Sequence, residues 1–440
     1  MEIGESPSLN APMTLDDYRW LVSPAATEWL ERAANQNGTL VAQTSALRRH
    51  LTAARTHLVL EQATLRIRAR QKFTAAGRMF FTPLALAQAT DEWLAAYKAS
   101  RFPPGQALVD LCCGIGGDLL AFARRCPVTG IDRDPVVALL AEANLAPVLG
   151  GVSGPSSAGI QVCDAVHAAL AGAAALHIDP DRRAIGKRTT RVALHSPGIN
   201  VLERLLTTCP AAAIKFAPAA ELPQRWTAEA ELEWISRDGE CRQLVAWFGP
   251  LALVPGRRRA TLVVTNEGRK QKPRAGEELE SLSPSYDIRT IEGDITMALP
   301  VADRLGRFLA EPDASVLAAG LTGPLAAEHG LAAVAPGIFY LTGEQAKLDP
   351  ALVWFEVGEV LPFDLKRLKS LLRQRGIGRL EVKKRGVPHD PEQVRQQLRV
   401  PGDQMATLFL TRLRGGVTAI VCRRLVQFPQ GTPFVQLPQQ

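Results

Sequence analysis

LVDLCCGIGGDLLAFA, residues 108–123, has the pattern of a buried strand that breaks into a glycine turn and continues as a helix. Gly114, Gly116 and Gly117 leave the main chain free of side chains where it turns, so that a ligand can approach the backbone closely. A strand, a glycine turn and a helix predict a nucleotide-binding site in an α/β domain. The same pattern also occurs in α/β domains that bind no nucleotide, so the neighbouring residues are needed to distinguish the two cases.

The acidic residues that end the predicted strands indicate which nucleotide is bound. Asp132 ends a second apolar run, VTGID, at a position suited to two ribose hydroxyls, and Asp164 ends a third run, IQVCD, where an adenine amino group can bind. A nicotinamide dinucleotide would need a glycine at Leu119 to complete G-x-G-x-x-G. S-adenosylmethionine has no pyrophosphate, and Asp110 would serve its methionine ammonium. We therefore predict S-adenosylmethionine as the cofactor.

Composition excludes several classes of protein. The chain has 440 residues, of which 46% are hydrophobic and 22% charged, and is long enough for two to four domains. The N-terminus has no apolar secretion signal, and the longest uncharged run near the middle, AVHAALAGAAALHI, is too short to span a membrane. The seven cysteines lack C-x-x-C spacing and a histidine cluster. We expect a cytoplasmic protein with no membrane helix, no metal and no disulfide.

These motifs resemble class I S-adenosylmethionine-dependent methyltransferases, in particular bacterial ones with a C-terminal THUMP-like domain that are related to trimethylguanosine synthases. The resemblance implies a Rossmann-like seven-stranded sheet and RNA as the substrate class. Cys112 stands where the usual G-x-G-x-G begins, a variant seen in the trimethylguanosine relatives, and counts with the cofactor-binding residues. The turn at Thr82 either covers the methionine end of the cofactor or only caps a helix. The matching segments are KFTAAGRMFFTPLALAQAT (72–90), VDLCCGIGGD (109–118), GIDRDP (130–135), HIDPDRRAIGKR (177–188), AIKFAP (213–218), EWISRDGE (233–240), and GRLEVKKRGV with DPEQVRQQL between 378 and 398.

The predicted fold is α/β, a Rossmann-like class I methyltransferase sheet with an N-terminal helical unit and a C-terminal α+β THUMP-like module. We expect the boundaries to fall where the apolar pattern changes. They give an N-terminal helical region (1–100), the methyltransferase domain (101–265), a linker or exposed hairpin (266–295), and a C-terminal region (296–440) whose basic THUMP-like module covers about 350–425.

The loop after the fourth predicted strand is the candidate acceptor site. HIDPDRR places Asp179 and Pro180 beside the cofactor, where amino-group methylases often hold an (Asp/Asn/Ser)-Pro-Pro-aromatic turn. We predict that Asp179 and Pro180 are catalytic, with Asp179 orienting the acceptor nitrogen or accepting its proton. Alternatively, Asp179 caps a turn on a solvated loop. Cations after it would bind substrate phosphate, namely Arg182, Arg183, Lys187 and Arg188.

The positive charge is concentrated near the C-terminus. The whole chain has a net charge of +7, whereas residues 365–425 alone hold 15 Lys and Arg against four Asp and Glu, an excess of 11. Such a cluster favours contact with a phosphate backbone, although a helix that buries leucines also solvates its other face with cations. The predicted RNA-binding residues here are Lys366, Lys369, Arg373, Lys383, Lys384 and Arg385.

The sequence therefore predicts an enzyme, an S-adenosylmethionine-dependent methyltransferase that modifies a base nitrogen in structured RNA such as tRNA or rRNA, with guanine favoured by the resemblance. Two other functions stay open. One is a methyltransferase for a protein or a small molecule. The other is a non-catalytic RNA-binding protein whose methyltransferase domain has decayed around the altered Asp-Pro loop.

Overall fold

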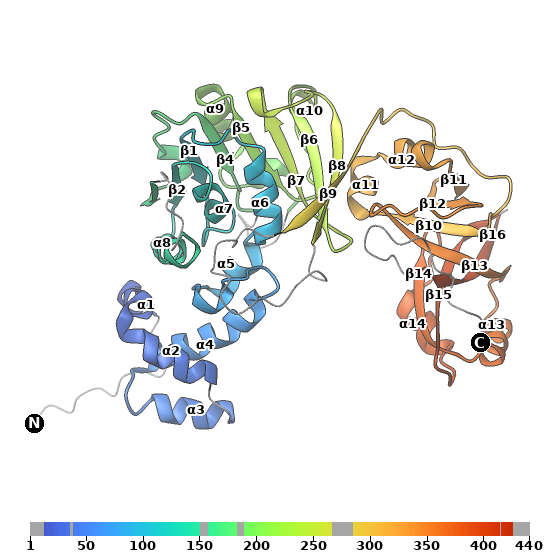
Figure 1. The fold of residues 1–440 in the computed structure, drawn as a ribbon, viewed down its shortest axis with the longest axis horizontal. Coiled ribbons are helices and arrows are strands. Elements are labelled where there is room, and N and C mark those ends of the chain that lie inside the picture. Colours follow the sequence, from blue (N-terminus) through green and yellow to red (C-terminus); the bar gives the residue numbers. More distant parts are fainter. Residues whose placement is uncertain are drawn as a thin grey trace, which may run out of the picture. The chain divides into compact units, whose positions relative to one another are not determined.

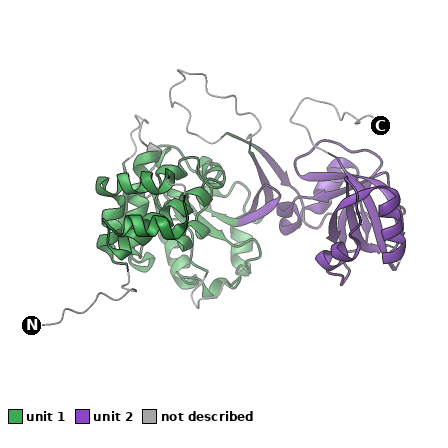
Figure 2. Ribbon diagram, turned by 90° about the horizontal axis from the view of Figure 1, so that it is seen from below, with its two compact units in different colours: residues 1–232, 244–256, 265–287 green, residues 233–243, 257–264, 288–440 purple. Residues whose placement is uncertain are grey.

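The computed structural model describes residues 13–35, 38–149, 157–182, 189–265, 285–413 and 415–425. The chain divides into two compact units (Figure 2). Unit 1 comprises residues 1–232, 244–256 and 265–287, and unit 2 comprises residues 233–243, 257–264 and 288–440.

Helices precede the first strand of unit 1 (Figure 1). Thr82 caps α5, because its side chain accepts a hydrogen bond from the Ala85 amide at 3.2 Å, and Pro83 occupies the first helical position. Among the described helices, not one combines the length and hydropathy that crossing a bilayer requires. The helices are α1 (Leu15–Val22), α2 (Thr27–Asn35), α3 (Leu40–Leu47), α4 (Ala53–Ala69), α5 (Pro83–Gln88) and α6 (Glu92–Ser100).

A nine-stranded sheet follows, in the order β3-β2-β1-β4-β5-β7-β6-β8-β9. Strands β3, β2, β1, β4 and β5 are parallel, and β7 is antiparallel to β5. Because β1 pairs with both β2 and β4, the strand order reverses there, and ligands of such sheets bind at the carboxyl ends beside that point. The strands are β1 (Leu108–Leu111), β2 (Val128–Asp132), β3 (Ala158–Val162), β4 (Ala175–Ile178), β5 (Ala212–Phe216), β6 (Glu231–Arg237), β7 (Glu240–Phe248), β8 (Arg258–Thr265) and β9 (Tyr286–Glu292), and the helices between them are α7 (Leu119–Ala123), α8 (Pro135–Leu149), α9 (Ile199–Thr208) and α10 (Gln224–Glu229).

The predicted α/β sheet is confirmed, but the expected number of seven strands is wrong, because the sheet contains nine. Strand β6 carries Glu231 and Glu233, which hide its apolar pattern although both are buried. Arg101 Nη2 lies 3.0 Å from Glu231 Oε2, and the Thr261 hydroxyl donates to Glu233 at 2.5 Å. Strand β9 falls within the range expected to be a linker or exposed hairpin; residues 266–284 of that range lie outside the described residues.

Unit 2 contains a seven-stranded sheet, in the order β11-β12-β10-β13-β16-β15-β14. Its edge strand β14 runs parallel to β15, and the other pairings are antiparallel. The elements are β10 (Phe308–Pro312), α11 (Ala314–Ala319), α12 (Thr322–His329), β11 (Ala332–Ala335), β12 (Ile338–Gly343), β13 (Leu352–Pro362), α13 (Leu365–Gln374), β14 (Ile377–Lys384), α14 (Pro391–Gln397), β15 (Gln404–Leu413) and β16 (Gly416–Arg424).

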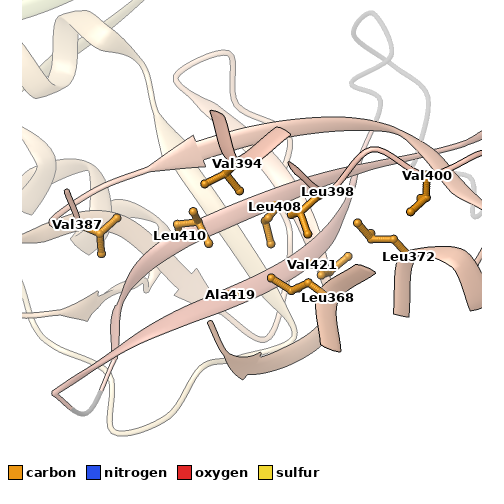
Figure 3. Close-up of a cluster of buried hydrophobic side chains, with 10 residues drawn as sticks. All are labelled: Leu368, Leu372, Val387, Val394, Leu398, Val400, Leu408, Leu410, Ala419 and Val421. Atoms are coloured by element: carbon orange, nitrogen blue, oxygen red, sulfur yellow. The ribbon is translucent and has the colours of Figure 1, made fainter. Parts of the chain in front are cut away.

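Helices α13 and α14 and strands β15 and β16 share an apolar core (Figure 3). Leu368 and Leu372 of α13 are buried against Leu408 of β15 and Val421 of β16. Burial of each such side chain stabilises the fold by about 1.5–3 kcal/mol. The core therefore explains the leucine spacing of α13, and the prediction of a C-terminal α+β module is confirmed.

Candidate functional site

A cavity of about 450 Å³ lies in unit 1 at the carboxyl ends of the central parallel strands. It brings together side chains and backbone from β1, β2, β4 and the loop before α5. Gly116 does not line it, and Arg183, Lys187 and Arg188 lie outside the described residues. The predicted site residues in its wall are Thr82, Asp110, Cys112, Gly114, Gly117, Asp132, Asp164, Asp179, Pro180 and Arg182.

Asp110 is the buried carboxylate of this cavity. The residue is 1% exposed, and its Oδ1 lies 2.7 Å from Nδ1 of His177, its neighbour in the parallel register of β1 and β4. Its other oxygen, Oδ2, is buried and has no hydrogen-bond partner among the described residues. Burial raises the pKa of Asp110, and His177 opposes the shift. A buried carboxylate oxygen without a partner requires a donor, so the site is suited to a cationic ligand group.

The turn after β1 uses left-handed backbone at three positions. Gly114 has a φ of 57° and Gly116 a φ of 92°, and a Cβ added at Gly114 would meet nothing within 4 Å. Cys112 also has a φ of 57°, a conformation that L side chains adopt at a cost. Gly117 has a different role, because a Cβ there would lie 2.9 Å from the backbone N and O of Thr90.

Cys112 allows a direct test of this strain. Replacing Cys112 by glycine removes the strain of the left-handed backbone, which stabilises the folded state by about 1–2 kcal/mol. Glycine also makes the unfolded chain more flexible, which offsets about 0.5–1 kcal/mol of that gain. Cys112→Ala removes the thiol equally but keeps the strain. We expect the free energy of unfolding of Cys112→Gly to exceed that of Cys112→Ala by about 0.5–1 kcal/mol in urea titrations. If Cys112→Ala is as stable as Cys112→Gly or more stable, the backbone at this position is not strained.

Asp132 ends β2 with its carboxylate fixed by backbone amides. Oδ2 accepts from the Gly114 amide at 2.9 Å and Oδ1 from the Asp134 amide at 3.0 Å. Burial raises the pKa of Asp132, while these two amides oppose the rise. Asp164 is exposed and accepts from the Val166 amide at 2.9 Å. Each carboxylate thus has a fixed orientation at the cavity, and each retains lone pairs for a ligand.

Asp179 follows β4 and forms an ion pair that the sequence did not predict. Its Oδ2 lies 2.5 Å from Nζ of Lys215, which belongs to β5. Burial would lower the pKa of Lys215, but the carboxylates of Asp179 and Asp118 raise it above its ordinary value. Lys215 therefore stays charged and holds one oxygen of Asp179, while no described residue pairs with Oδ1.

Several cavity residues were not predicted from the sequence, and His177 and Tyr18 are two of them. His177 stands two residues before Asp179, and its pairing with Asp110 follows only once β4 is placed beside β1. An alignment of the predicted strands VDL and LHI at their carboxyl ends would have placed His177 beside Asp110. Tyr18 comes from α1, 92 positions before Asp110, and nothing in the helical periodicity marks it as a cavity residue.

The predicted RNA-binding cations of unit 2 fall into two groups. Lys366 and Arg373 are exposed on α13, Lys369 is half-buried there, and Lys384 is exposed on β14. In contrast, Lys383 Nζ lies 2.6 Å from Glu311 Oε2, and Arg385 Nη2 lies 3.8 Å from Oε1 of the same residue. An acidic partner on β10 therefore partly neutralises Lys383 and Arg385, because the sheet brings Glu311 close to them.

Comparison with known proteins gives a domain family for part of the chain and relatives for most of it. Residues 352–424 match the model of the THUMP domain-like family. Two relatives from Mycobacterium tuberculosis, strains CDC 1551 / Oshkosh and H37Rv, are each 33% identical over 351 residues, which cover 78% of this chain and 88% of the relative. Both are described as uncharacterised S-adenosylmethionine-dependent methyltransferases. The chain belongs to the S-adenosylmethionine-dependent methyltransferases.

A solved structure extends this likeness at the level of the fold. A protein of Porphyromonas gingivalis W83, provisionally assigned as a methyltransferase, is 20% identical, with a TM-score of 0.67 over 93% of this methyltransferase and 97% of the other chain. The relation to trimethylguanosine synthases stays a prediction.

The cavity of the methyltransferase fits its cofactor, S-adenosylmethionine. Asp110 Oδ2 is a buried acceptor that still needs a donor, as the methionine ammonium provides. Gly114 offers open space where a side chain would otherwise fill the turn. Asp132 presents a carboxylate held by two amides at the end of the next strand, suited to ribose hydroxyls. Asp110, Gly114 and Asp132 all line this cavity, so together they would hold the cofactor there.

Proposed function

We propose that this methyltransferase modifies a base nitrogen, with guanine favoured, in structured RNA. The observation that carries the proposal is the position of Asp179, whose carboxylate lies in the wall of the same cavity as Asp110. Donor and acceptor groups of methyl transfer must be aligned in one pocket that excludes water. The match to the THUMP domain-like family over residues 352–424 supports RNA as the acceptor.

In this proposal, different residues of the chain bind the donor and the acceptor. When bound, S-adenosylmethionine supplies an electrophilic methyl group on a sulfonium. Asp110 holds the amino group of the donor, and Asp132 holds its ribose. Lys215 fixes Oδ2 of Asp179, so that Oδ1 is available to orient the acceptor nitrogen or to take its proton. Pro180 shapes the same turn, and Arg182 at the cavity wall binds a substrate phosphate.

Labelled total RNA tests the proposal. Purified protein and labelled donor are incubated with total RNA from a strain that lacks the protein, and the RNA is digested to nucleosides. We expect label in one modified base of a structured RNA, and labelling slower by about 100-fold or more when Asp179 is replaced by asparagine. Label on protein or on small molecules, with unlabelled RNA, would reject RNA as the substrate.

A groove in unit 2 provides a surface for the RNA backbone. It has a volume of about 1270 Å³ and is lined by residues of β14, α14, β15 and β16. Arg379, Arg399 and Arg424 line it, are exposed, and form no ion pair with a described residue. Arg395 lies in the same groove but is already paired with Glu392 at 2.6 Å. Unpaired guanidinium groups bind phosphate and release counterions, so this groove complements the exposed cations of α13.

Salt dependence distinguishes the two kinds of arginine. We expect glutamine at positions 379, 399 and 424 together to weaken binding of unfractionated tRNA by about tenfold or more at moderate salt. Each lost phosphate contact makes the slope of the logarithm of the RNA association constant against the logarithm of salt concentration less steep by about 0.7–1. Arg395→Gln is the matched control and should change binding less than about twofold. Fluorescence anisotropy over a salt series measures both, and an unchanged slope in the triple variant would remove the groove from the RNA surface.

A further inference from the structure

Buried polar side chains connect two carboxylates of the cavity, Asp110 and Asp179. Asp118, in the turn after β1, lies between them: its Oδ1 is 2.7 Å from Nζ of Lys98, and its Oδ2 accepts from the Thr90 hydroxyl at 2.7 Å. Lys98 is fully buried, and Asp118 and Thr90 are 5% and 6% exposed. We call these three residues, with His177 and Lys215, the buried relay.

The donor arm of the buried relay runs from Lys98 to Asp110. Nζ of Lys98 lies 3.5 Å from Nε2 of His177, whose Nδ1 lies 2.7 Å from Asp110 Oδ1. An ammonium beside Nε2 favours a lone pair on that nitrogen and therefore places the proton on Nδ1, which donates to Asp110. Asp110 Oδ1 is thus occupied, and Oδ2 is left for the donor.

The acceptor arm runs from Asp118 to Asp179 through one hydroxyl. Thr90 Oγ1 donates its single hydrogen to Asp118, because an ionised carboxylate only accepts. The same oxygen accepts from Nζ of Lys215 at 2.9 Å, and Lys215 also donates to Asp179. The direction of every hydrogen bond in this arm is therefore fixed by the chemistry of the groups.

Charge and packing keep the buried relay in place. Burial alone would raise the pKa of Asp118, yet the ammonium of Lys98 holds it well below its ordinary value. Burial lowers the pKa of Lys98, and Asp118 opposes that shift. Gly117 packs directly on the Thr90 backbone and fixes the hydroxyl relative to the glycine turn.

We propose that Thr90 is a positioning residue, whose hydroxyl couples the donor-binding carboxylate Asp110 to the acceptor-site carboxylate Asp179 through Asp118 and Lys215. The donor arm depends only on cofactor binding. The acceptor arm rests on the proposed function. Loss of the hydroxyl leaves Asp118 and Lys215 each without one buried hydrogen bond, so both carboxylates lose part of their support.

Two substitutions of Thr90 separate positioning from packing. Thr90→Val keeps the shape and removes the hydroxyl, whereas Thr90→Ser keeps the hydroxyl and removes a methyl group. We expect Thr90→Val to raise the Kd for S-adenosylmethionine by about tenfold, measured by calorimetry, and to lower kcat of RNA methylation by about tenfold. Thr90→Ser should stay within about threefold of wild type in both. A residue that only packs predicts the opposite order.

A second threonine provides the matched control. Thr56 in α4 is 2% exposed, and its Oγ1 has no described partner, so Thr56→Val makes the same change outside the buried relay and should leave Kd unchanged. If Thr90→Val does not fold, Thr90→Ala carries the same expectation. Equal donor affinity of the valine and serine variants, or a weaker serine variant, overturns the coupling. Absence of RNA methylation by the wild-type protein would instead reject the proposed function and leave the donor arm to be judged by Kd alone.

Discussion

Asp110→Asn is expected to raise the Kd for S-adenosylmethionine by about 30-fold or more. Asparagine keeps the shape of the side chain but removes the charge that meets the donor's ammonium in a buried site. Breaking one partner of such a charge pair costs about 2–5 kcal/mol, and each 1.4 kcal/mol is a factor of ten. Calorimetry on the full chain measures the change.

Asp134→Asn is the control for this effect. Asp134 also lines the cavity, but it is exposed and its carboxylate caps α8 by accepting from the amides of Val136 and Val137. Asparagine can cap a helix equally well, so the Kd should change less than about threefold. Equal losses in both variants would mean that general charge, rather than the buried contact of Asp110, attracts the donor.

The pH dependence of donor binding tests independently whether the ionised carboxylate of Asp110 binds the donor. Burial raises the pKa of this carboxyl in the ligand-free protein, against the opposing effect of His177. The charged and titratable groups that face it are His177 from β4, Asp118 from the following turn and Lys98 from α6. A bound ammonium favours the ionised carboxylate, so donor affinity falls as the pH drops through the pKa of Asp110 and is restored above it. Asp110→Asn should lose this dependence.

Asp179→Asn is expected to lower the rate of RNA methylation by about 100-fold or more, with the Kd for the donor within about threefold of wild type. Removal of a general base or of an orienting carboxylate typically costs two to four orders of magnitude. The substitution also leaves Lys215 without its anionic partner, which destabilises the protein by about 1–3 kcal/mol.

A double variant separates the loss of reaction rate from the loss of stability. In Asp179→Asn/Lys215→Met the buried ammonium is gone, so the stability lost through an unpaired charge should be partly regained. If the missing carboxylate causes the slow reaction, the double variant stays slow. Recovery of activity in the double variant, or more than half of the wild-type rate in Asp179→Asn alone, would remove Asp179 from the acceptor site.

What the sequence predicted well is local in the chain. The strand, glycine turn and helix of residues 108–123 were correctly predicted, and Asp110, Asp132 and Asp179 line one cavity because parallel strands end at the same edge of the sheet. Thr82 caps its helix through a hydrogen bond of three-residue span. Short-range patterns of this kind need no knowledge of the sheet order.

What the sequence did not predict depends on partners far away in the chain. The pairing of His177 with Asp110 requires the β1–β4 register, and the burial of Glu233 in β6 requires the hydroxyl of Thr261. Likewise, Lys383 was predicted to bind RNA, but Glu311 of β10 lies beside it. In each case a charged or polar side chain has a partner that no local periodicity reveals.

A crystal structure of the full chain with S-adenosylhomocysteine tests the central claim most directly. We expect the amino group of the ligand within hydrogen-bond distance of Asp110 Oδ2, its ribose hydroxyls on Asp132, and its main contact with the backbone at Gly114. A ligand bound elsewhere, or an Asp132 carboxylate turned to solvent in the occupied site, would contradict the account.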